Sequence, residues 1–242
     1  MSHKLSFFGH SAFRIVTEKD LKIWIDPWLD NPQATGKPDS MDADLILITH
    51  AHEDHIGNCL DMAKSSATEV VAIHEIQQYL LIKGLPNVTG MNIGGTYITK
   101  GVAITMVPAL HSSSIQEGNE ILYGGEAAGF VICLEDGLIL YHAGDTGLFG
   151  DMALIGGMYR PEITMVPIGN HYTMGPREAA CACKFIRAQK VIPMHYGSFP
   201  ALTGTVEEFN RELKSQQVDT ELVELKPGES MREHFPVKGQ GS

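Results

Sequence analysis

The sequence contains no apolar run long enough to cross a membrane, and residues 1–6 lack the apolar segment of a secretory signal. We therefore expect a soluble, cytoplasmic protein. Positive charge is also scarce: 18 Lys and Arg stand against 29 Asp and Glu, which gives a formal net charge of −11 at pH 7. Because nucleic acids and anionic membranes bind cationic surfaces, this balance argues against both as partners.

Cysteine is scarce as well. The chain has four cysteines, none of which forms a Cys-x-x-Cys pair, and their spacing indicates no disulfide framework. We predict reduced, mostly buried thiols that neither cross-link the chain nor hold a metal ion. These residues are Cys59, Cys133, Cys181 and Cys183.

No linker, low-complexity segment or break in composition divides the 242 residues, of which 43% are hydrophobic. We predict one domain spanning residues 1–242. Short β-rich segments fill the first 25 residues, and strands then alternate with helices, which indicates an α/β fold. Residues 128–142 have the pattern of a hairpin, and a polar tail is expected after residue 225. Helices are predicted at 56–65, 74–83, 176–189 and 206–217, with Thr205 capping the last of them.

The densest group of metal-binding side chains follows the apolar run 43–48, which has the pattern of a buried strand. His50, His52, Asp54 and His55 lie within six residues. Alternating residues of an extended chain point the same way, and Asp54 and His55 can face a second point as the chain turns. Imidazole and carboxylate groups suit zinc, iron, manganese or nickel. This stretch can therefore serve two metal ions.

Further polar residues stand at the ends of later apolar strands. The strand-rich segment 94–107 leads to His111, and the hairpin 128–142 leads to Asp145. Strands at 163–167 and 190–194 lead to Asn170-His171 and to His195-Tyr196. Each of these side chains is thus a candidate for the same site.

The segment from His50 to His55 fits the H-x-H-x-D-H motif of the metallo-β-lactamase superfamily, and His111, Asp145 and His195 follow in the order that this superfamily uses. The resemblance covers nearly the whole chain. It implies a four-layer αββα fold, in which two mixed β-sheets pack face to face with helices outside. Segments 9–11, 25–28, 141–146 and 193–197 further resemble a small bacterial branch of metal-dependent hydrolases, which is similar to ascorbate-6-phosphate lactonase.

The resemblance also implies two divalent metal ions per chain, zinc first, with manganese, iron or nickel as alternatives. Two dications carry four positive charges, against two from carboxylates and one from a bridging hydroxide. The remaining positive charge favours an anionic substrate or a developing oxyanion. One ion would be held by His50, His52 and His111, the other by Asp54, His55 and His195, with Asp145 bridging the two.

The expected reaction is hydrolysis of a small, anionic ester, lactone or phosphoester by a metal-bridging hydroxide, since metal ions lower the pKa of water from about 15.7 toward about 7. Asp54 would orient this nucleophile or carry its proton. Tyr196 could donate to an oxyanion, although a packing role is as plausible, and Asn170 and His171 could contact substrate or form a polar loop. His10 and Asp26 could orient ligands through the second imidazole nitrogen or be ordinary turn residues.

Three other functions compete with a small-molecule hydrolase. A phosphodiesterase acting on nucleic acid, like the related tRNA-processing endonucleases, would need an RNA-gripping arm and a more favourable charge. Redox chemistry like that of flavodiiron proteins would need a glutamate in place of His52 and usually a flavin domain. A non-catalytic metal-binding module stays open, and so does assembly into a homo-oligomer.

Overall fold

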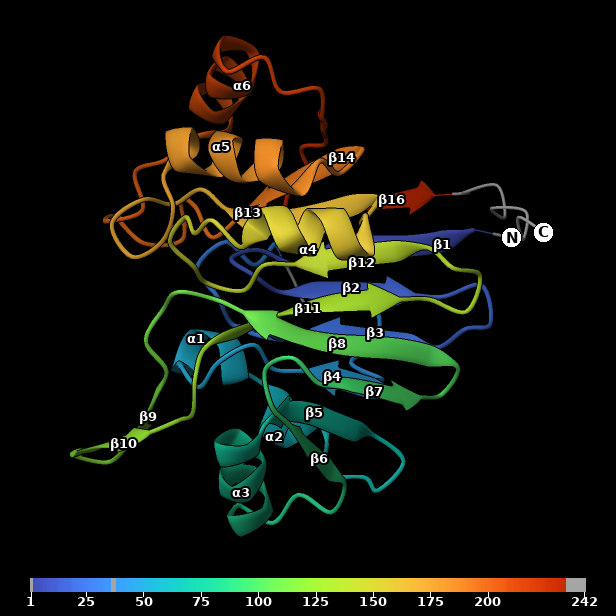
Figure 1. Cartoon of the computed structure of the whole chain (residues 1–242). Coiled ribbons are helices and arrows are strands. Elements are labelled where there is room, and N and C mark those ends of the chain that lie inside the picture. Colours follow the sequence, from blue (N-terminus) through green and yellow to red (C-terminus); the bar gives the residue numbers. More distant parts are fainter. Residues whose placement is uncertain (1, 36–37, 234–242) are drawn as a thin grey trace.

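The structure, a computed structural model, describes residues 2–35 and 38–233 (Figure 1). Two seven-stranded mixed sheets pack face to face, and helices lie outside them. The expected four-layer αββα architecture is confirmed. Each sheet is antiparallel at one side and parallel at the other, so the carboxyl ends of several strands meet along one edge of the sandwich.

The first sheet combines an antiparallel meander with three parallel pairings. Strands from β16 to β3 pair antiparallel, and strands from β3 to β6 pair parallel. In spatial order the strands are β16 (Ser230–Glu233), β1 (His3–Phe7), β2 (Phe13–Val16), β3 (Lys22–Ile25), β4 (Leu45–Leu47), β5 (Glu69–Ile73) and β6 (Val88–Met91).

The second sheet repeats this plan. Strands from β7 to β12 pair antiparallel, and strands from β12 to β15 pair parallel. Its strands are, in spatial order, β15 (Glu221–Leu222), β14 (Lys190–Met194), β13 (Ile163–Pro167), β12 (Ile139–His142), β11 (Ala128–Cys133), β8 (Val102–Pro108) and β7 (Thr96–Thr99). A separate hairpin of β9 (Ser114–Glu117) and β10 (Glu120–Tyr123) projects from the body of the molecule (Figure 1).

Helix α3 (His74–Ile82) packs against β5 and β6 of the first sheet. Helices α4 (Met152–Tyr159), α5 (Pro176–Ile186) and α6 (Val206–Ser215) form a layer on the second sheet, where α5 contacts both of the others. Two four-residue helices, α1 (Glu53–Ile56) and α2 (Cys59–Met62), follow β4.

Several predicted elements are confirmed and some are corrected. The hairpin at 128–142 forms, and the Thr205 side chain accepts a hydrogen bond from the Glu208 amide as an N-cap. The single helix predicted at 56–65 is wrong, because Gly57 takes a positive φ of 46° and separates α1 from α2. The polar tail contains a strand, β16, whose pairing with β1 gives it order that its composition does not predict.

Two apolar cores hold the layers together. The larger lies between the sheets and includes Phe7, Phe13 and Ile25 from the first sheet and Phe130 from the second. The smaller joins the second sheet to its helices around Phe209. Burial of each such side chain contributes roughly 1.5–3 kcal/mol relative to exposure, so the sandwich is a stable frame for residues at its edge.

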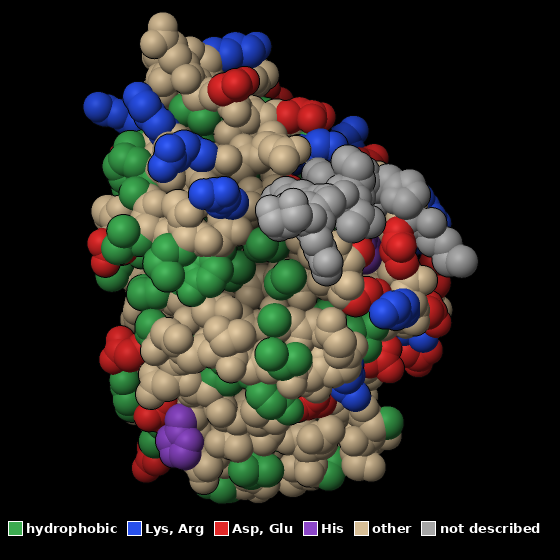
Figure 2. Space-filling model, turned by 45° about the vertical axis from the view of Figure 1, so that its right-hand side comes forward, with side chains coloured by type: hydrophobic (Ala, Val, Ile, Leu, Met, Phe, Trp, Pro, Cys, Tyr) green, Lys and Arg blue, Asp and Glu red, His purple; other side chains and the backbone are tan. Residues whose placement is uncertain are grey.

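The surface is mixed in character. Figure 2 shows hydrophobic side chains scattered over the middle of one face, with Lys and Arg gathered higher up, at the height of α5 and α6.

All four cysteines are free, as predicted. In residues 2–35 and 38–233, no helix combines the length and the apolar character needed to cross a membrane.

Candidate metal centre

Seven side chains that the sequence separates by up to 145 positions converge at the strand ends along one edge of the sandwich. We call this group the seven-residue cluster. Donor atoms of its members fall into overlapping groups in which all atoms lie within 4.8 Å of one another. Four members follow β4, and one each follows β8, β12 and β14. The members are His50, His52, Asp54, His55, His111, Asp145 and His195.

The first group contains only imidazoles. His50 Nε2 and His52 Nδ1 lie 2.9 Å apart, and the ring centroid of His111 is 5.1 Å and 5.2 Å from those of His50 and His52. Two nitrogens that each bind one zinc ion at about 2.0–2.1 Å can be this close. The geometry therefore suits three nitrogen ligands around one ion.

Asp145 lies at the middle of the seven-residue cluster. Its Oδ2 atom is 2.8 Å from His195 Nε2, 3.3 Å from His55 Nε2 and 3.7 Å from His111 Nε2. Gly144 precedes it with a positive φ of 62°, and a Cβ atom there would collide with the Ala128 carbonyl oxygen. Only glycine fits this close approach, which sets the direction of the chain just before Asp145.

The second group joins Asp54, His55 and His195 with His10. His10 Nε2 is 3.1 Å from Asp54 Oδ2 and donates to it, because an ionised carboxylate only accepts. The other ring nitrogen, Nδ1, is 2.6 Å from Ser198 Oγ. His10 is thus bound on both sides and holds Asp54 in place, which is the orienting role that the sequence left open.

Asp26 orients two of the histidines from behind. Its Oδ2 atom accepts from His55 Nδ1 at 2.8 Å and from the Thr49 hydroxyl at 2.6 Å, and its Oδ1 atom accepts from the Thr49 amide. The Thr49 hydroxyl, 3.0 Å from His50 Nδ1, can accept from that ring in turn. Both rings therefore carry a proton on Nδ1 and present Nε2 to the cluster, the arrangement in which a carboxylate fixes a ligand tautomer.

Burial and charge set the protonation of these rings. Burial lowers the pKa of His50 well below its ordinary value, and burial also lowers the pKa of His52 and His111, so all three favour the neutral, metal-binding form. Burial alone would also lower the pKa of His55, but Asp145 and Asp26 outweigh it and raise that pKa well above its ordinary value. His55 thus holds a proton in the place that a cation would take.

Buried polar atoms without a hydrogen-bond partner indicate whether metal ions fit the cluster. Among the described residues, Asp145 Oδ1, His55 Nε2 and His195 Nδ1 are buried and make no hydrogen bond. Leaving a buried polar atom unsatisfied costs roughly 1–3 kcal/mol. A cation between Asp145 and the Nε2 atom of His55 would satisfy two of these three atoms. The donor set, nitrogen and carboxylate oxygen without sulfur, suits first-row divalent ions.

A cavity of about 280 Å³ opens onto the cluster. Beside five members of the cluster, it is lined by Ser112, Tyr172 and Phe199. No pattern in the sequence indicates a functional role for Tyr172 or Phe199, although they lie close in sequence to two predicted site residues, His171 and His195. Among the described residues, neither Lys nor Arg lines this cavity.

Comparison with known proteins agrees with this geometry. A family model described as a β-lactamase superfamily domain matches residues 4–195. A UPF0173 metal-dependent hydrolase of Methanopyrus kandleri is 46% identical over 228 residues, which cover 94% of this chain and 98% of that protein. The chain belongs to the metallo-β-lactamase superfamily. Like these relatives, it is a metal-dependent hydrolase.

Solved structures show the same fold in this hydrolase superfamily. Igni18, described as a novel metallo hydrolase from the archaeon Ignicoccus hospitalis, is 37% identical, with a TM-score of 0.86 over 98% of this chain and all of that one. An isothiocyanate hydrolase from Delia radicum gut bacteria has a TM-score of 0.73 at 18% identity, covering 97% of this chain and 99% of that one. The second likeness concerns the fold alone.

Three other predicted site residues of this hydrolase lie outside the cavity lining. The Tyr196 side chain packs against the smaller core, and burial raises its pKa to about 12. Asn170 and His171 are exposed on a loop where both take a positive φ, of 66° and 53°. The His171 ring meets the Tyr172 ring edge-on at 4.4 Å, so it touches the cavity wall from outside. The catalytic roles suggested for Tyr196 and His171 stay predictions without geometric support.

Proposed function

We propose that this hydrolase cleaves a small ester, lactone or phosphoester, with two divalent ions held by the seven-residue cluster. The observation that supports this most is the position of Asp145. Its Oδ2 atom lies within 2.8–3.7 Å of imidazole nitrogens from both ligand groups. A carboxylate shared in this way suits the bridging ligand of a two-ion centre. Zinc fits the donor set best, and manganese, iron or nickel are alternatives.

Divalent ions bound here would supply a water of lowered pKa as the nucleophile and an electrophile for the substrate oxygen. Residues around the seven-residue cluster hold its ligands in position. Asp26 and Thr49 hold the His50 and His55 rings, and His10 holds Asp54 by one carboxylate oxygen. Asp54 also lines the cavity and is partly exposed, so it is placed to take a proton from the attacking water and return it to the leaving group.

The cavity wall narrows the substrate class. Because the described lining of the cavity contains no Lys or Arg, we attribute any preference for an anion to the metal ions themselves. Tyr172 and Phe199 offer aromatic surface to the part of the substrate that does not react. We therefore place the scissile group beside Asp145 and a small apolar or aromatic group against these two rings.

Nucleic acid is the weaker candidate substrate. The β9–β10 hairpin does form a projecting arm, which the sequence did not predict. Residues 114–123 nevertheless contain Glu117 and Glu120 and neither Lys nor Arg, so this arm would repel a phosphate backbone. Salt-sensitive binding of RNA by the purified protein would reverse this ranking.

Metal removal tests the proposal. Protein purified without a chelating tag should contain up to two divalent ions per chain by elemental analysis. It should also hydrolyse at least one member of a panel of aryl esters, lactones, phosphodiesters and an aryl isothiocyanate. Removal of the ions with a chelator should abolish turnover, and added zinc or manganese should restore it. Undiminished turnover by metal-free protein would exclude this mechanism, and one ion per chain at full activity would exclude the two-ion form.

A further inference from the structure

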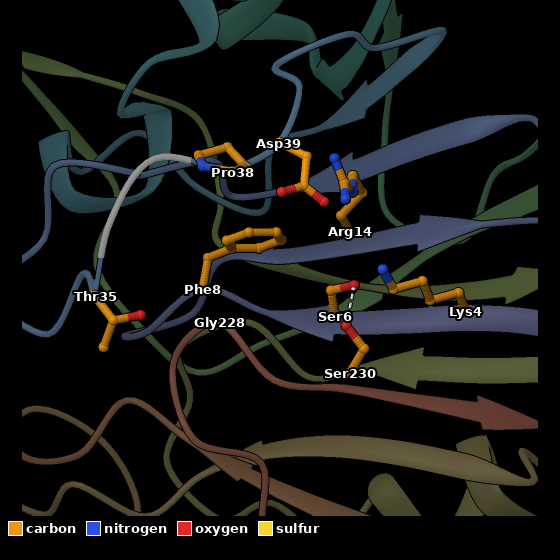
Figure 3. A pocket seen from close by; sticks show the side chains of 9 residues that line it. All are labelled: Lys4, Ser6, Phe8, Arg14, Thr35, Pro38, Asp39, Gly228 and Ser230. Carbon is orange, nitrogen blue, oxygen red and sulfur yellow. Dashed lines mark hydrogen bonds between the residues drawn. The ribbon is translucent and has the colours of Figure 1, made fainter.

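A second pocket lies on the first sheet, away from the seven-residue cluster, and shares no residue with it (Figure 3). Its volume is about 140 Å³. On β1, Lys4 and Ser6 alternate with Leu5 and Phe7, which point into the core between the sheets. Lys4 and Ser6 therefore point to the opposite, outer face. We call this pocket the sheet-face pocket; it is lined by Lys4, Ser6, Phe8, Arg14, Thr35, Pro38, Asp39, Gly228 and Ser230.

Arg14 in this pocket is a nearly buried cation, with 7% of its surface exposed. Its guanidinium lies 5.4 Å and 5.2 Å from the Phe8 and Trp24 ring centroids, and Nη1 donates to the Ser40 carbonyl at 2.9 Å. Among the described side chains it forms no ion pair, and its buried Nε has no hydrogen-bond partner. Asp39 and Asp42 favour the charged guanidinium from a distance, and Asp39 lies next to Arg14 in Figure 3, but neither forms an ion pair with it. A buried polar atom without a partner is costly, so an anion bound against this guanidinium would stabilise the arrangement.

Lys4 adds a second cation, which likewise makes no ion pair with the side chains that the structure describes. Beside it, the hydroxyl groups of Ser6 and Ser230 lie 2.9 Å apart, across the pairing of β1 and β16. Two hydroxyls that share one hydrogen bond keep one hydrogen free to donate to a ligand. Figure 3 shows Lys4, Ser6 and Ser230 grouped on one side of the pocket, with Asp39 on the other.

The charge of the lining is positive although the chain as a whole is acidic. Lys4 and Arg14 contribute two positive charges, and Asp39 contributes one negative charge. Two cations beside a pair of hydroxyl donors form a binding pattern for oxyanions, because charge-assisted hydrogen bonds to phosphate or carboxylate are among the strongest in proteins. The small volume restricts the ligand to a small ion or to the end group of a larger molecule.

We propose that the sheet-face pocket binds a small oxyanion, a phosphate or a carboxylate, through Lys4, Arg14 and the Ser6–Ser230 pair. This site is independent of the metal centre and of the reaction proposed there. The aromatic rings beside Arg14 hold the guanidinium in position, so that little order has to be created when the anion binds.

Calorimetric titration of inorganic phosphate and, separately, of acetate into the metal-loaded protein tests this at constant ionic strength. The variant Lys4→Gln should weaken binding of the preferred anion by roughly tenfold or more, the loss expected for one charge-assisted hydrogen bond. Lys22→Gln is the matched control: Lys22 lies on the same outer face but pairs with Asp20 at 3.7 Å, outside the pocket. The affinity of the Lys22→Gln variant for the preferred anion should equal that of the wild-type protein.

Anion binding at the metal centre does not confuse the result, because neither lysine touches the cluster and that contribution is common to all three proteins. Tighter binding of phosphate than of acetate assigns the site to phosphate groups, and the reverse order assigns it to carboxylates. Ser230→Ala keeps both positive charges of the pocket and should cause a smaller loss of anion affinity. It provides a second test of the pocket if the Lys4→Gln variant does not fold. The proposal fails if Lys4→Gln and Ser230→Ala, both folded by circular dichroism, bind both anions as wild type does.

Discussion

The two sheets contribute to the metal centre in different ways. The first sheet supplies four cluster members from one short segment after β4. Two of their imidazoles are oriented by Asp26 and Thr49, and the Asp54 carboxylate is held by His10. The second sheet supplies one residue at the end of each of three strands. The ligands from the first sheet are neighbours in the sequence and are held by hydrogen bonds from nearby residues. The ligands from the second sheet are brought together only by the tertiary structure, and Asp145 is the one carboxylate among them.

This difference indicates which substitution should weaken metal binding most. Among the residues that the structure describes, Asp145 is the only carboxylate that lies within 4 Å of imidazole nitrogens from both of the proposed ion sites. On the first sheet, by contrast, the loss of one orienting hydrogen bond leaves the ligand itself in place. Variants on the two sides should therefore differ in severity, and the following predictions rank them.

The largest effect is expected for Asp145→Ala. Turnover should fall by more than about a hundredfold, beyond the 10–100-fold usual for residues that only support a ligand, and at least one ion per chain should be lost. Elemental analysis and initial rates on the folded variant measure both. Asp151→Ala is the control, because Asp151 is an exposed carboxylate that makes no side-chain cap to α4.

Because Asp145 is buried among histidines, its removal could also disturb folding, so Asp145→Asn serves as a variant of the same shape. It should lose metal in the same way, since an amide oxygen carries no charge to offset two cations. Retention of two ions and normal rates by both variants would show that Asp145 is not the bridge.

A smaller effect is expected for Asp26→Asn. The amide can donate to His55 Nδ1, which would move the ring proton to Nε2 and turn a ligand atom into a donor. Metal affinity should fall about 10–100-fold, with turnover recovering when excess metal is added. Competition with a chelating dye measures the affinity, and Asp30→Asn, which changes an exposed carboxylate on the same loop, is the control. An unaltered affinity would mean that Asp26 supports the loop rather than the ligand.

The same contrast explains what the sequence could predict. The segment from His50 to His55 is a local pattern, and the alternation of strands and helices is local as well, so the sequence predicts the motif and an α/β fold directly. The four-layer αββα arrangement is implied by the family resemblance that the motif carries. The positions of His111, Asp145 and His195 at strand ends make them candidates, and the order of ligands in the superfamily assigns them to the metal centre. Residue spacing alone does not show that three distant strand ends meet.

Residues that depend on side-chain direction escaped prediction. Tyr196 follows His195 directly, yet the positive φ of 55° at His195 turns the chain, and the tyrosine side chain packs into the smaller core instead of the cavity. Tyr172 and Phe199 line the cavity because loops between strands and helices place them there. The pairing of β16 with β1, which brings Ser230 beside Ser6, joins the two ends of the described chain and has no local signal.

The smallest effect, and the one that probes the first-sheet histidines most directly, is a proton count. In the metal-free protein Asp145 and Asp26 raise the pKa of His55 well above its ordinary value despite burial, whereas burial lowers the pKa of His50, His52 and His111. At pH 7, metal loading should therefore release about one proton from His55, because among these four rings only His55 still carries the second proton that a cation displaces. A metal-bound water of lowered pKa would add to this release, so the His55 contribution is the part that changes in Asp26→Asn.

Calorimetric titration of zinc into the metal-free protein, in two buffers of different ionisation enthalpy, counts that proton. As the pH rises from about 6.5 to the raised pKa of His55, the apparent affinity should increase about tenfold per unit, and above that pKa it should level off. In Asp26→Asn one of the two carboxylates that raise this pKa is neutral, so proton release at pH 7 should decrease. A heat of binding at pH 7 that does not depend on the buffer in the wild-type protein would show that His55 is already neutral before metal binds.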